Sequence, residues 1–279
     1  MSDPNAVAGA FSLSGRVVAV TGAAGLIGGE LVRVLGAAGA HIAAVDNHPV
    51  CDGETIRAHL GLEPDLSCRG YRCDITEEAA VDALIEAIVS DSGRIDVLIN
   101  CAAIDAKFDS SGDGQGSAAL HDMPLDLWQK SVDVNMTGTF LTTRRVLQQM
   151  QDQGGGNIVN VASVYALVAP DQTLYGDPDA PGFRPKPVDY VATKSFVPNF
   201  TRYIASTYGR RGIRANSVVP HGIETDHDDD FKRRFAQHSP LGRMCRLSEI
   251  GPPVLFLASD ASSYMTGSTL VVDGGWTAW

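Results

Sequence analysis

The chain has 279 residues, enough for one large domain or two small ones with a sizeable hydrophobic core. Hydrophobic residues make up 44% and charged residues 20% of the sequence, which argues against a disordered or fibrous protein. A net charge of -11, from 22 basic and 33 acidic residues, disfavours nucleic acid and anionic membranes as partners.

Short apolar segments alternate with helix-length amphipathic segments along the chain. The apolar segments are continuous rather than alternating, which predicts strands buried on both faces. Their alternation with helices predicts right-handed crossovers and a parallel sheet. We therefore predict a single α/β domain over residues 1–279, a doubly wound parallel sheet with helices on both faces. The expected strands begin at Val17, His41, Asp96, Asn157, Ile213 and Thr269. One expected helix begins at Leu26, and four more cover residues 77–88, 125–151, 189–208 and 247–257.

Three polar segments interrupt this pattern, at residues 105–119, 171–187 and 225–240. None is flanked by a second strand and helix pattern of its own, so we interpret them as long loops rather than linkers. Each follows the carboxyl end of an expected strand, where open parallel sheets bind ligands. We expect substrate-side insertions or a lid, with the acidic run at residues 226–230 starting a helix rather than binding a metal.

The five cysteines form no CxxC pair and show no zinc-ligand spacing, so we interpret them as reduced packing thiols and predict no metal site. The N-terminus lacks the basic start and apolar run of a secretion signal. No segment reaches the roughly 20 apolar residues that span a bilayer. A cytoplasmic protein is expected.

A glycine-rich loop follows the first expected strand. In TGAAGLIGG, Gly22, Gly25 and Gly28 lead directly into a helix, where they permit a tight turn, a close approach to a pyrophosphate and close helix packing. The next strand ends in Asp46, 18 positions after Gly28, where a dinucleotide-binding fold places a carboxylate for the adenosine ribose. Together these features predict a Rossmann fold that binds a dinucleotide.

Asp46 also predicts which dinucleotide is bound. A 2′-phosphate beside this carboxylate would be disfavoured by about 4 kcal/mol per charge pair at 4 Å and an effective dielectric of 20. The neighbouring Asn47 and His48 offer no arginine fork to compensate. We expect NAD rather than NADP as the cofactor.

A candidate catalytic group follows in the second half of the chain. In YVATK, Tyr190 and Lys194 lie one helical turn apart on the same face. The spacing alone is common. Two further residues strengthen the catalytic interpretation of Tyr190 and Lys194. They are Ser163 at the end of an expected strand and Asn135 inside the long helix at residues 125–151.

These motifs, in this order, resemble the short-chain dehydrogenase/reductase family over residues 15–276. The matching pieces are TGAAGLIG, Asp46, CDIT, NCAA, Asn135, Ser163, YVATK, PHGIET and YMTGSTLVVDGG. The resemblance implies a catalytic tetrad of Asn135, Ser163, Tyr190 and Lys194. It also implies a cofactor site that includes Gly22, Gly25, Leu26, Ile27, Asp46, Asp74, Ile75, Asn100, Ala102, Tyr190, Lys194, Ile223 and Thr225.

The chemistry of an alcohol oxidation fits this tetrad. To take up the alcohol proton, Tyr190 must act as a phenolate, so its pKa of about 10 must fall by about three units. One ammonium at about 4 Å supplies that much, and we expect Lys194 to be sufficient. Ser163 would hold the substrate oxygen, and Asn135 would place a water that relays the proton beyond Lys194.

Several features depart from the family pattern. The GxxGxxG loop resembles the longer sugar-nucleotide epimerases and dehydratases. His221 stands where the family usually has a glycine. It is interpreted either as a proton donor at the mouth of the site or as a benign replacement. The interval from Ser163 to Tyr190, 27 positions, is about twice the common one, and its cations are Arg184 and Lys186. It resembles insertions in enzymes for activated or amino sugars, but an interface loop is equally open.

The expected function is NAD-dependent hydride transfer between the nicotinamide and a small-molecule secondary alcohol or ketone. A polyol or an activated or amino sugar is the suggested substrate. Two alternatives stay open, an epimerase or dehydratase that recycles bound NAD and a nucleotide-binding protein without turnover. The helix at residues 189–208 is apolar on more than one side, through Phe196, Phe200, Tyr203 and Ile204, which favours a homotetramer first and a dimer second.

Overall fold

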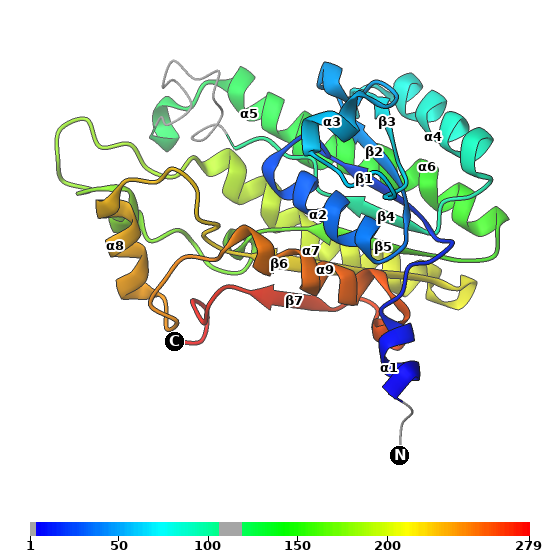
Figure 1. The fold of residues 1–279 in the computed structure, drawn as a ribbon. Coiled ribbons are helices and arrows are strands. Elements are labelled where there is room, and N and C mark those ends of the chain that lie inside the picture. Colours follow the sequence, from blue (N-terminus) through cyan, green and yellow to red (C-terminus); the bar gives the residue numbers. More distant parts are fainter. Residues whose placement is uncertain (1–3, 106–118) are drawn as a thin grey trace.

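The computed structural model describes residues 4–105 and 119–279. Within them, seven strands form one parallel sheet in the order β3-β2-β1-β4-β5-β6-β7 (Figure 1). The order reverses direction between β1 and β4, as in a doubly wound sheet. The predicted Rossmann-type fold is confirmed. The strands are β1 Val17–Thr21, β2 His41–Asp46, β3 Cys68–Arg72, β4 Val97–Asn100, β5 Gly156–Val161, β6 Ile213–Pro220 and β7 Thr269–Val272.

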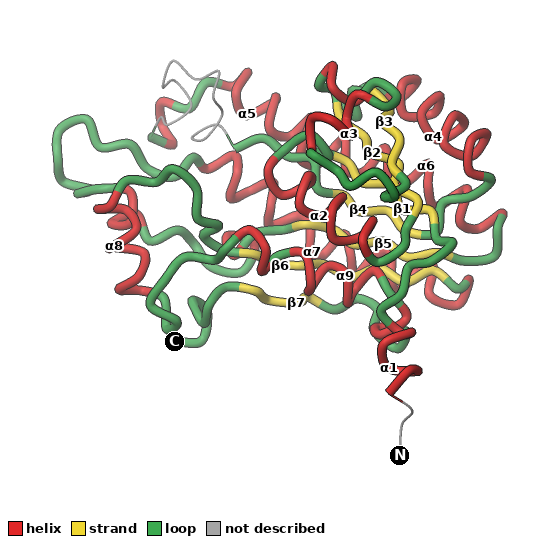
Figure 2. Tube along the Cα trace, viewed as in Figure 1, coloured by secondary structure: helices red, strands yellow, loops and turns green. Residues whose placement is uncertain are grey.

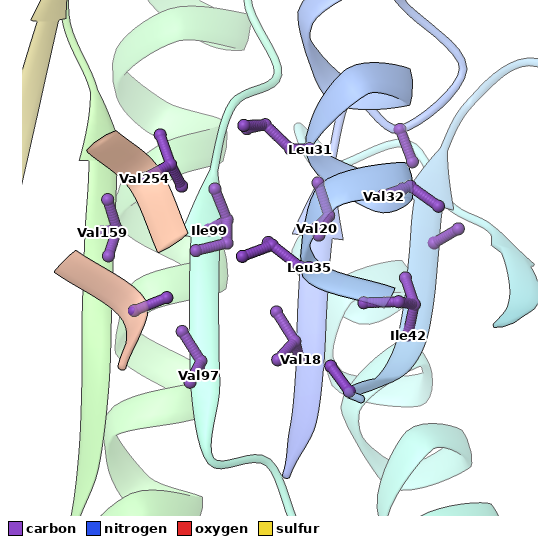
Figure 3. Packing of buried hydrophobic residues seen from close by; sticks show 14 of the residues in the cluster. Val18, Val20, Leu31, Val32, Leu35, Ile42, Val97, Ile99, Val159 and Val254 are labelled. Atoms are coloured by element: carbon purple, nitrogen blue, oxygen red, sulfur yellow. The ribbon is translucent and has the colours of Figure 1, made fainter. Parts of the chain in front are cut away.

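Helices cover both faces of the sheet. On one face, Val18 and Val20 of β1 pack with Leu31 and Leu35 of α2 and with Val254 of α9 (Figure 3). The intervening β1 residues face a second cluster with α4, α6 and α7. Because successive strand residues point to opposite faces, an apolar strand is buried by two helix layers. The helices are α1 Pro4–Ala10, α2 Leu26–Ala37, α3 Thr55–Leu60, α4 Glu78–Ser92, α5 Leu125–Val132, α6 Thr139–Asp152, α7 Val188–Tyr208, α8 Asp229–His238 and α9 Gly251–Ala258.

Some elements differ from the sequence predictions. Strand β3 was not predicted, because CRGYR alternates buried and exposed positions and carries two arginines at the edge of the sheet. The helix predicted over residues 125–151 is divided into α5 and α6 by a π-helical turn, Asp133–Gly138. Such a turn widens the helix locally, which apolar periodicity does not reveal.

The three polar segments have different structures. Residues 106–118 of the first lie outside the described part of the chain. The second, at 171–187, is mostly irregular but contains a short 3-10 helix, Gln172–Tyr175 (Figure 2). The third, expected as an insertion or lid with a helix start at its acidic run, contains α8. The start of α8 is capped by Asp228, which accepts a 2.7 Å hydrogen bond from the Phe231 amide. The acidic run therefore starts a helix, as expected.

Among the described helices, none combines the length and the apolar character needed to cross a membrane.

Candidate active site

Backbone geometry fixes the glycine loop between β1 and α2. Gly22 has a φ of +71° and lies so close to the next strand end that a Cβ atom would stand 2.7 Å from the Ala102 Cα. A Cβ on Gly28 would stand 2.0 Å from the Gly22 carbonyl oxygen. Gly25 precedes the first helical residue, Leu26. The loop thus brings the amino end of α2 and its free amide groups to the carboxyl edge of the sheet.

The Asp46 carboxylate is held beside this loop. It accepts hydrogen bonds from the Ala24 amide at 3.1 Å and from the His48 amide at 3.0 Å. Strand β3 places Arg72 opposite Asp46, and Arg72 Nε donates to the Asn47 carbonyl at 3.2 Å. An arginine therefore lies near the ribose position, although the sequence neighbours of Asp46 offer none. It was missed because β3 was not predicted.

The next two cofactor residues come from the segment after β3. Asp74 is exposed and accepts 3.0 and 2.8 Å hydrogen bonds from the Thr76 amide and hydroxyl. Ile75 is buried against Gly138, where a Cβ atom would stand 2.6 Å from the isoleucine side chain. Asp74 and Ile75 both line the same cavity as the glycine loop.

Asn100 has its side chain in a buried polar network, and its predicted contact with the cofactor stays a prediction. Its side chain is buried and does not line the cavity. The Asn100 Nδ2 atom donates to Thr143 Oγ1 at 2.9 Å and to Asn160 Oδ1 at 2.8 Å, and its Oδ1 accepts from Thr142 at 2.9 Å. This polar network ties β4 to β5 and α6. Ala102 does line the cavity.

The structure brings Ser163, Tyr190 and Lys194 together. Ser163 follows β5 and caps a 3-10 turn by accepting a 3.3 Å hydrogen bond from the Tyr165 amide. Its hydroxyl is within hydrogen-bonding reach of the Tyr190 phenol. Lys194 is buried, donates to the Val161 carbonyl at 2.9 Å, and lies 5.8 Å from the centroid of the Tyr190 ring.

The expected lowering of the Tyr190 pKa in the cofactor complex stays a prediction, and the protein groups around the phenol act in the opposite direction. Burial and the Asp105 carboxylate raise the pKa of the Tyr190 phenol, and among the described residues the Ser163 hydrogen bond lowers it. Burial also lowers the pKa of Lys194. The charged form of Lys194 is therefore disfavoured by its own desolvation, which weakens its influence on the phenol.

Asn135 lies in the π-helical turn and does not line the cavity. Its Oδ1 accepts from the Ile104 amide at 2.8 Å, and its Nδ2 donates to the Ile104 carbonyl at 3.1 Å and to Thr193 Oγ1 at 3.0 Å. These bonds fix Ile104, which lines the cavity, and connect it to the helix that carries Tyr190. The water-relay role of Asn135 stays a prediction.

A cavity of about 1210 Å³ joins the glycine loop to the catalytic residues. Its volume exceeds that of usual small-ligand pockets, so it has room for a dinucleotide and a substrate. It is lined by Gly22, Gly25, Leu26, Ile27, Asp46, Asp74, Ile75, Ala102, Ser163, Tyr190, Lys194, Ile223 and Thr225 among other residues. Of the predicted site residues, only Asn100 and Asn135 do not line it.

Aromatic side chains dominate the wall beyond Tyr190. Tyr165 and Tyr175 are joined by their hydroxyl groups at 2.5 Å, and Phe231 and Phe235 of α8 line the same region. None of these was predicted as a site residue. Tyr165 and Tyr175 come from two short turns that the sequence did not define, and no motif marked Phe231 and Phe235 of α8. Their rings make this end of the cavity largely apolar.

His221 lines the cavity with a buried side chain, and its two predicted alternatives, a proton donor and a benign replacement, stay predictions. It is 7% exposed, and its ring centroid lies 4.4 Å from that of Trp276 and 4.9 Å from that of Phe235. Burial lowers the pKa of His221 to about 4. Its surroundings therefore favour the neutral imidazole.

Lys186 is a second buried cation in the cavity. It is 4% exposed, pairs with Asp105 and lies over the Tyr190 ring with its Nζ 4.3 Å from the ring centroid. Burial lowers the pKa of Lys186, and Asp105 raises it. The sequence showed Lys186 as a cation of the long 171–187 segment but gave no sign of this position.

Comparisons with known proteins agree with the fold and the motifs. Residues 16–176 match the short chain dehydrogenase family, and residues 179–277 match the family described as Enoyl-(Acyl carrier protein) reductase. The sheet, the glycine loop and the Ser163, Tyr190 and Lys194 group define an α/β oxidoreductase of the kind that uses a nicotinamide dinucleotide. The chain belongs to the short-chain dehydrogenase/reductase family.

Several relatives cover nearly the whole chain. It is 34% identical to the D-threitol dehydrogenase of Mycolicibacterium smegmatis, over 96% of this chain and 95% of that protein. It is 33% identical to a 2,5-dichloro-2,5-cyclohexadiene-1,4-diol dehydrogenase of Sphingobium indicum, over 95% and 98%. Among solved structures, a gluconate 5-dehydrogenase from Burkholderia cenocepacia in complex with NADP and tartrate has a TM-score of 0.81 and 30% identity, with 98% and 99% of the chains covered.

Proposed function

We propose that the protein is an NAD-dependent dehydrogenase that interconverts a secondary alcohol and a ketone, with Tyr190 as the general acid and base. One observation carries the proposal. A single cavity connects the glycine loop and Asp46 to Ser163, Tyr190 and Lys194. A dinucleotide bound along this path would bring its reactive end to the catalytic group.

The residues of the cavity fit this cofactor. The cradle at Gly22 and Gly28 leaves no room for a Cβ atom, which suits a close approach of pyrophosphate to the backbone. The Asp46 carboxylate has acceptor capacity left for ribose hydroxyls. When bound, the oxidised nicotinamide would accept a hydride from the substrate carbon.

The protein side chains would handle the proton. Ser163 would donate a hydrogen bond to the substrate oxygen, and Tyr190 would take the alcohol proton. Because burial raises the pKa of Tyr190, two positive charges are needed to lower it, the Lys194 ammonium and that of the oxidised cofactor. Lys194 would also bind the nicotinamide ribose, so its two roles are linked.

The preference for NAD rests on Asp46. Its carboxylate would repel the 2′-phosphate of NADP. The guanidinium of Arg72 on β3 would instead attract that phosphate. We place more weight on Asp46, because it lines the cavity and Arg72 does not. Two solved neighbours are named for NADP or NADPH, so both cofactors belong in any assay.

For the substrate, the relatives suggest polyols and hydroxylated rings. One acts on D-threitol and another on a cyclohexadiene diol, as their names state. The spacing of the glycine loop supports one alternative, an epimerase or dehydratase that recycles NAD. A non-catalytic protein is disfavoured by the grouping of Ser163, Tyr190 and Lys194.

The test is a screen of alcohols, polyols and sugar nucleotides with NAD⁺ and with NADP⁺, followed at the absorbance of the reduced cofactor. We expect reduced cofactor and ketone to accumulate together, with NAD⁺ preferred. A tightly held cofactor without net reduction would favour the epimerase, and binding without turnover would favour the non-catalytic protein.

For the assembly we propose a homotetramer, with a dimer as the second choice. Tyr203 of α7 is 63% exposed although Ile204 beside it is buried, and Phe196 stacks on Phe200 at 4.7 Å between ring centroids. An apolar helix face of this kind fits a second copy of α7. Light scattering of wild type and of a Phe200→Glu, Tyr203→Glu variant tests this. The expected mass is about four times 29.5 kDa and lower in the variant, whereas a wild-type monomer would contradict it.

A further inference from the structure

The pair formed by Lys186 and Asp105 is a charged feature of the substrate half that the family tetrad does not explain. Lys186 is 4% exposed, and its ammonium contacts the Asp105 carboxylate in the wall of the cavity, near the Tyr165 and Tyr190 rings. Burying two charges is costly unless they are paired and hydrogen-bonded. Such a pair next to the catalytic tyrosine is therefore a candidate for substrate binding.

The chain holds Lys186 in a defined position. It lies between Pro185 and Pro187, whose rings restrict the backbone. Its amide donates a 2.9 Å hydrogen bond to Gln172 Oε1, which anchors the end of the 171–187 segment. Pro187 immediately precedes α7, the helix that carries Tyr190. Lys186 and Tyr190 are consequently positioned by the same rigid junction.

The position of the pair relative to Tyr190 suggests what it contacts. The Lys186 Nζ lies 4.3 Å from the centroid of the Tyr190 ring and 5.9 Å from that of Tyr165. A substrate whose reacting oxygen binds the Tyr190 hydroxyl would extend its neighbouring carbons along this wall. A hydroxyl group there can accept a hydrogen bond from an ammonium and donate one to a carboxylate, so it satisfies both members of the pair.

The balance of charge argues against an anionic substrate. Asp105 already offsets the Lys186 ammonium. Asp126, Lys130 and Asp133 line the same large cavity. Within the described part of the chain, a carboxylate or phosphate beside Lys186 would meet the Asp105 carboxylate as well, whereas a neutral hydroxyl would not be repelled.

We propose that Lys186 and Asp105 form a binding site for a second hydroxyl group of the substrate, which selects neutral diols and polyols over simple alcohols. This proposal rests on the proposed dehydrogenase function. A hydrogen bond to a charged group contributes enough to change specificity about ten- to a hundredfold. The pair would act on recognition of the substrate and leave the proton chemistry to Tyr190.

The test compares cyclohexane-1,2-diol with cyclohexanol as substrates of the wild type and of an Asp105→Asn, Lys186→Met double variant. The double variant leaves no lone buried charge. We expect the wild type to prefer the diol in kcat/KM by about tenfold or more, and the double variant to lose that preference. The readout is the ratio of the two substrates within each protein, because loss of Asp105 also changes the surroundings of Tyr190. Arg184→Met, which removes an exposed cation outside the cavity, should behave like wild type.

Three results would overturn the proposal. They are an equal loss of kcat/KM on both alcohols in the double variant, no preference for the diol in the wild type, and a preference for 2-hydroxycyclohexanecarboxylate. A binding measurement separates this from failure of the proposed function. Calorimetry of the two alcohols with the Tyr190→Phe variant in excess NAD⁺ needs no turnover. Tighter binding of the diol, lost in the Tyr190→Phe, Asp105→Asn, Lys186→Met variant, would support the subsite even if no alcohol were oxidised. Equal binding of both alcohols would contradict it.

Discussion

The cofactor half of the cavity is shaped by backbone atoms, and the substrate half is shaped by side chains from distant segments. At the glycine loop, Gly22 and Gly28 approach neighbouring backbone atoms so closely that no side chain fits. Beyond Tyr190, the wall comes from turns and from α8, through Tyr165, Tyr175 and Phe235. Backbone contacts restrict the residue type strictly, whereas a wall of side chains tolerates exchange. The first half should therefore fix the cofactor and the second should vary with the substrate.

Substitution of Tyr190, where the two halves meet, should have the largest effect. Tyr190→Phe removes the hydroxyl that transfers the proton but keeps the ring, so kcat should fall by about a thousandfold. Dinucleotide affinity, measured by fluorescence titration, should stay within a few-fold of wild type. Tyr208→Phe, at the far end of α7, serves as the control. If the Tyr190 variant kept more than about a tenth of the wild-type kcat, Tyr190 would not be the acid and base.

The backbone character of the cofactor half can be tested at Gly28. In Gly28→Ala the new Cβ would stand 2.0 Å from the Gly22 carbonyl oxygen, so the loop must shift. We expect dinucleotide affinity to fall by about a hundredfold. Gly209→Ala, where a Cβ meets nothing within 4 Å, should bind normally. Titration calorimetry together with a thermal melt distinguishes lost binding from lost folding, and normal affinity in a folded Gly28→Ala protein would refute the close approach.

The choice between NAD and NADP can be altered at the end of β2. An Asp46→Ala, Asn47→Arg variant removes the opposing carboxylate and adds a guanidinium, so the ratio of kcat/KM for the two cofactors should shift toward NADP by about a hundredfold. Arg72→Ala should leave the use of NAD unchanged and weaken any residual use of NADP. A wild-type preference for NADP would show that Arg72 outweighs Asp46.

The smallest effect expected is on stability in the substrate half. The pKa of buried His221 is lowered to about 4, so between pH 7 and pH 5 the unfolded chain takes up a proton there that the folded protein does not. Stability should therefore fall with decreasing pH, and this histidine should account for about 2 kcal/mol of the loss at pH 5. Urea unfolding at pH 7 and pH 5 measures this. The free energy of unfolding of His221→Gln should fall between the two pH values by about 2 kcal/mol less than that of the wild type. His121→Gln, with a side chain 82% exposed, should keep the wild-type pH dependence, and an equal dependence in His221→Gln would contradict the burial effect.

The two halves also differ in how far the sequence predicts them. Gly22, Gly28 and Asp46 were identified because backbone constraints leave a regular spacing in the sequence. Arg72 was missed because its edge strand is polar at alternate positions. Asn100 was expected near the cofactor, but its amide is used in a buried network that only the packing of three elements creates.

On the substrate side, the pairing of Lys186 with Asp105 joins positions 81 residues apart. No local pattern marks such a contact. The raised pKa of Tyr190 likewise depends on burial and on Asp105, neither of which the YVATK motif contains. The identity of the catalytic residue was readable from the sequence, but its electrostatic surroundings were not.

Transfer of a labelled hydride tests the central claim most directly. The purified protein would be incubated with NAD⁺ and cyclohexane-1,2-diol carrying deuterium at its carbinol carbons, and the reduced cofactor and the ketone would be analysed by mass spectrometry. We predict one deuterium in each NADH formed, in equal amount to the released ketone, and none of either product with Tyr190→Phe. Exchange or inversion at the labelled carbon without released ketone or net NADH would contradict the account.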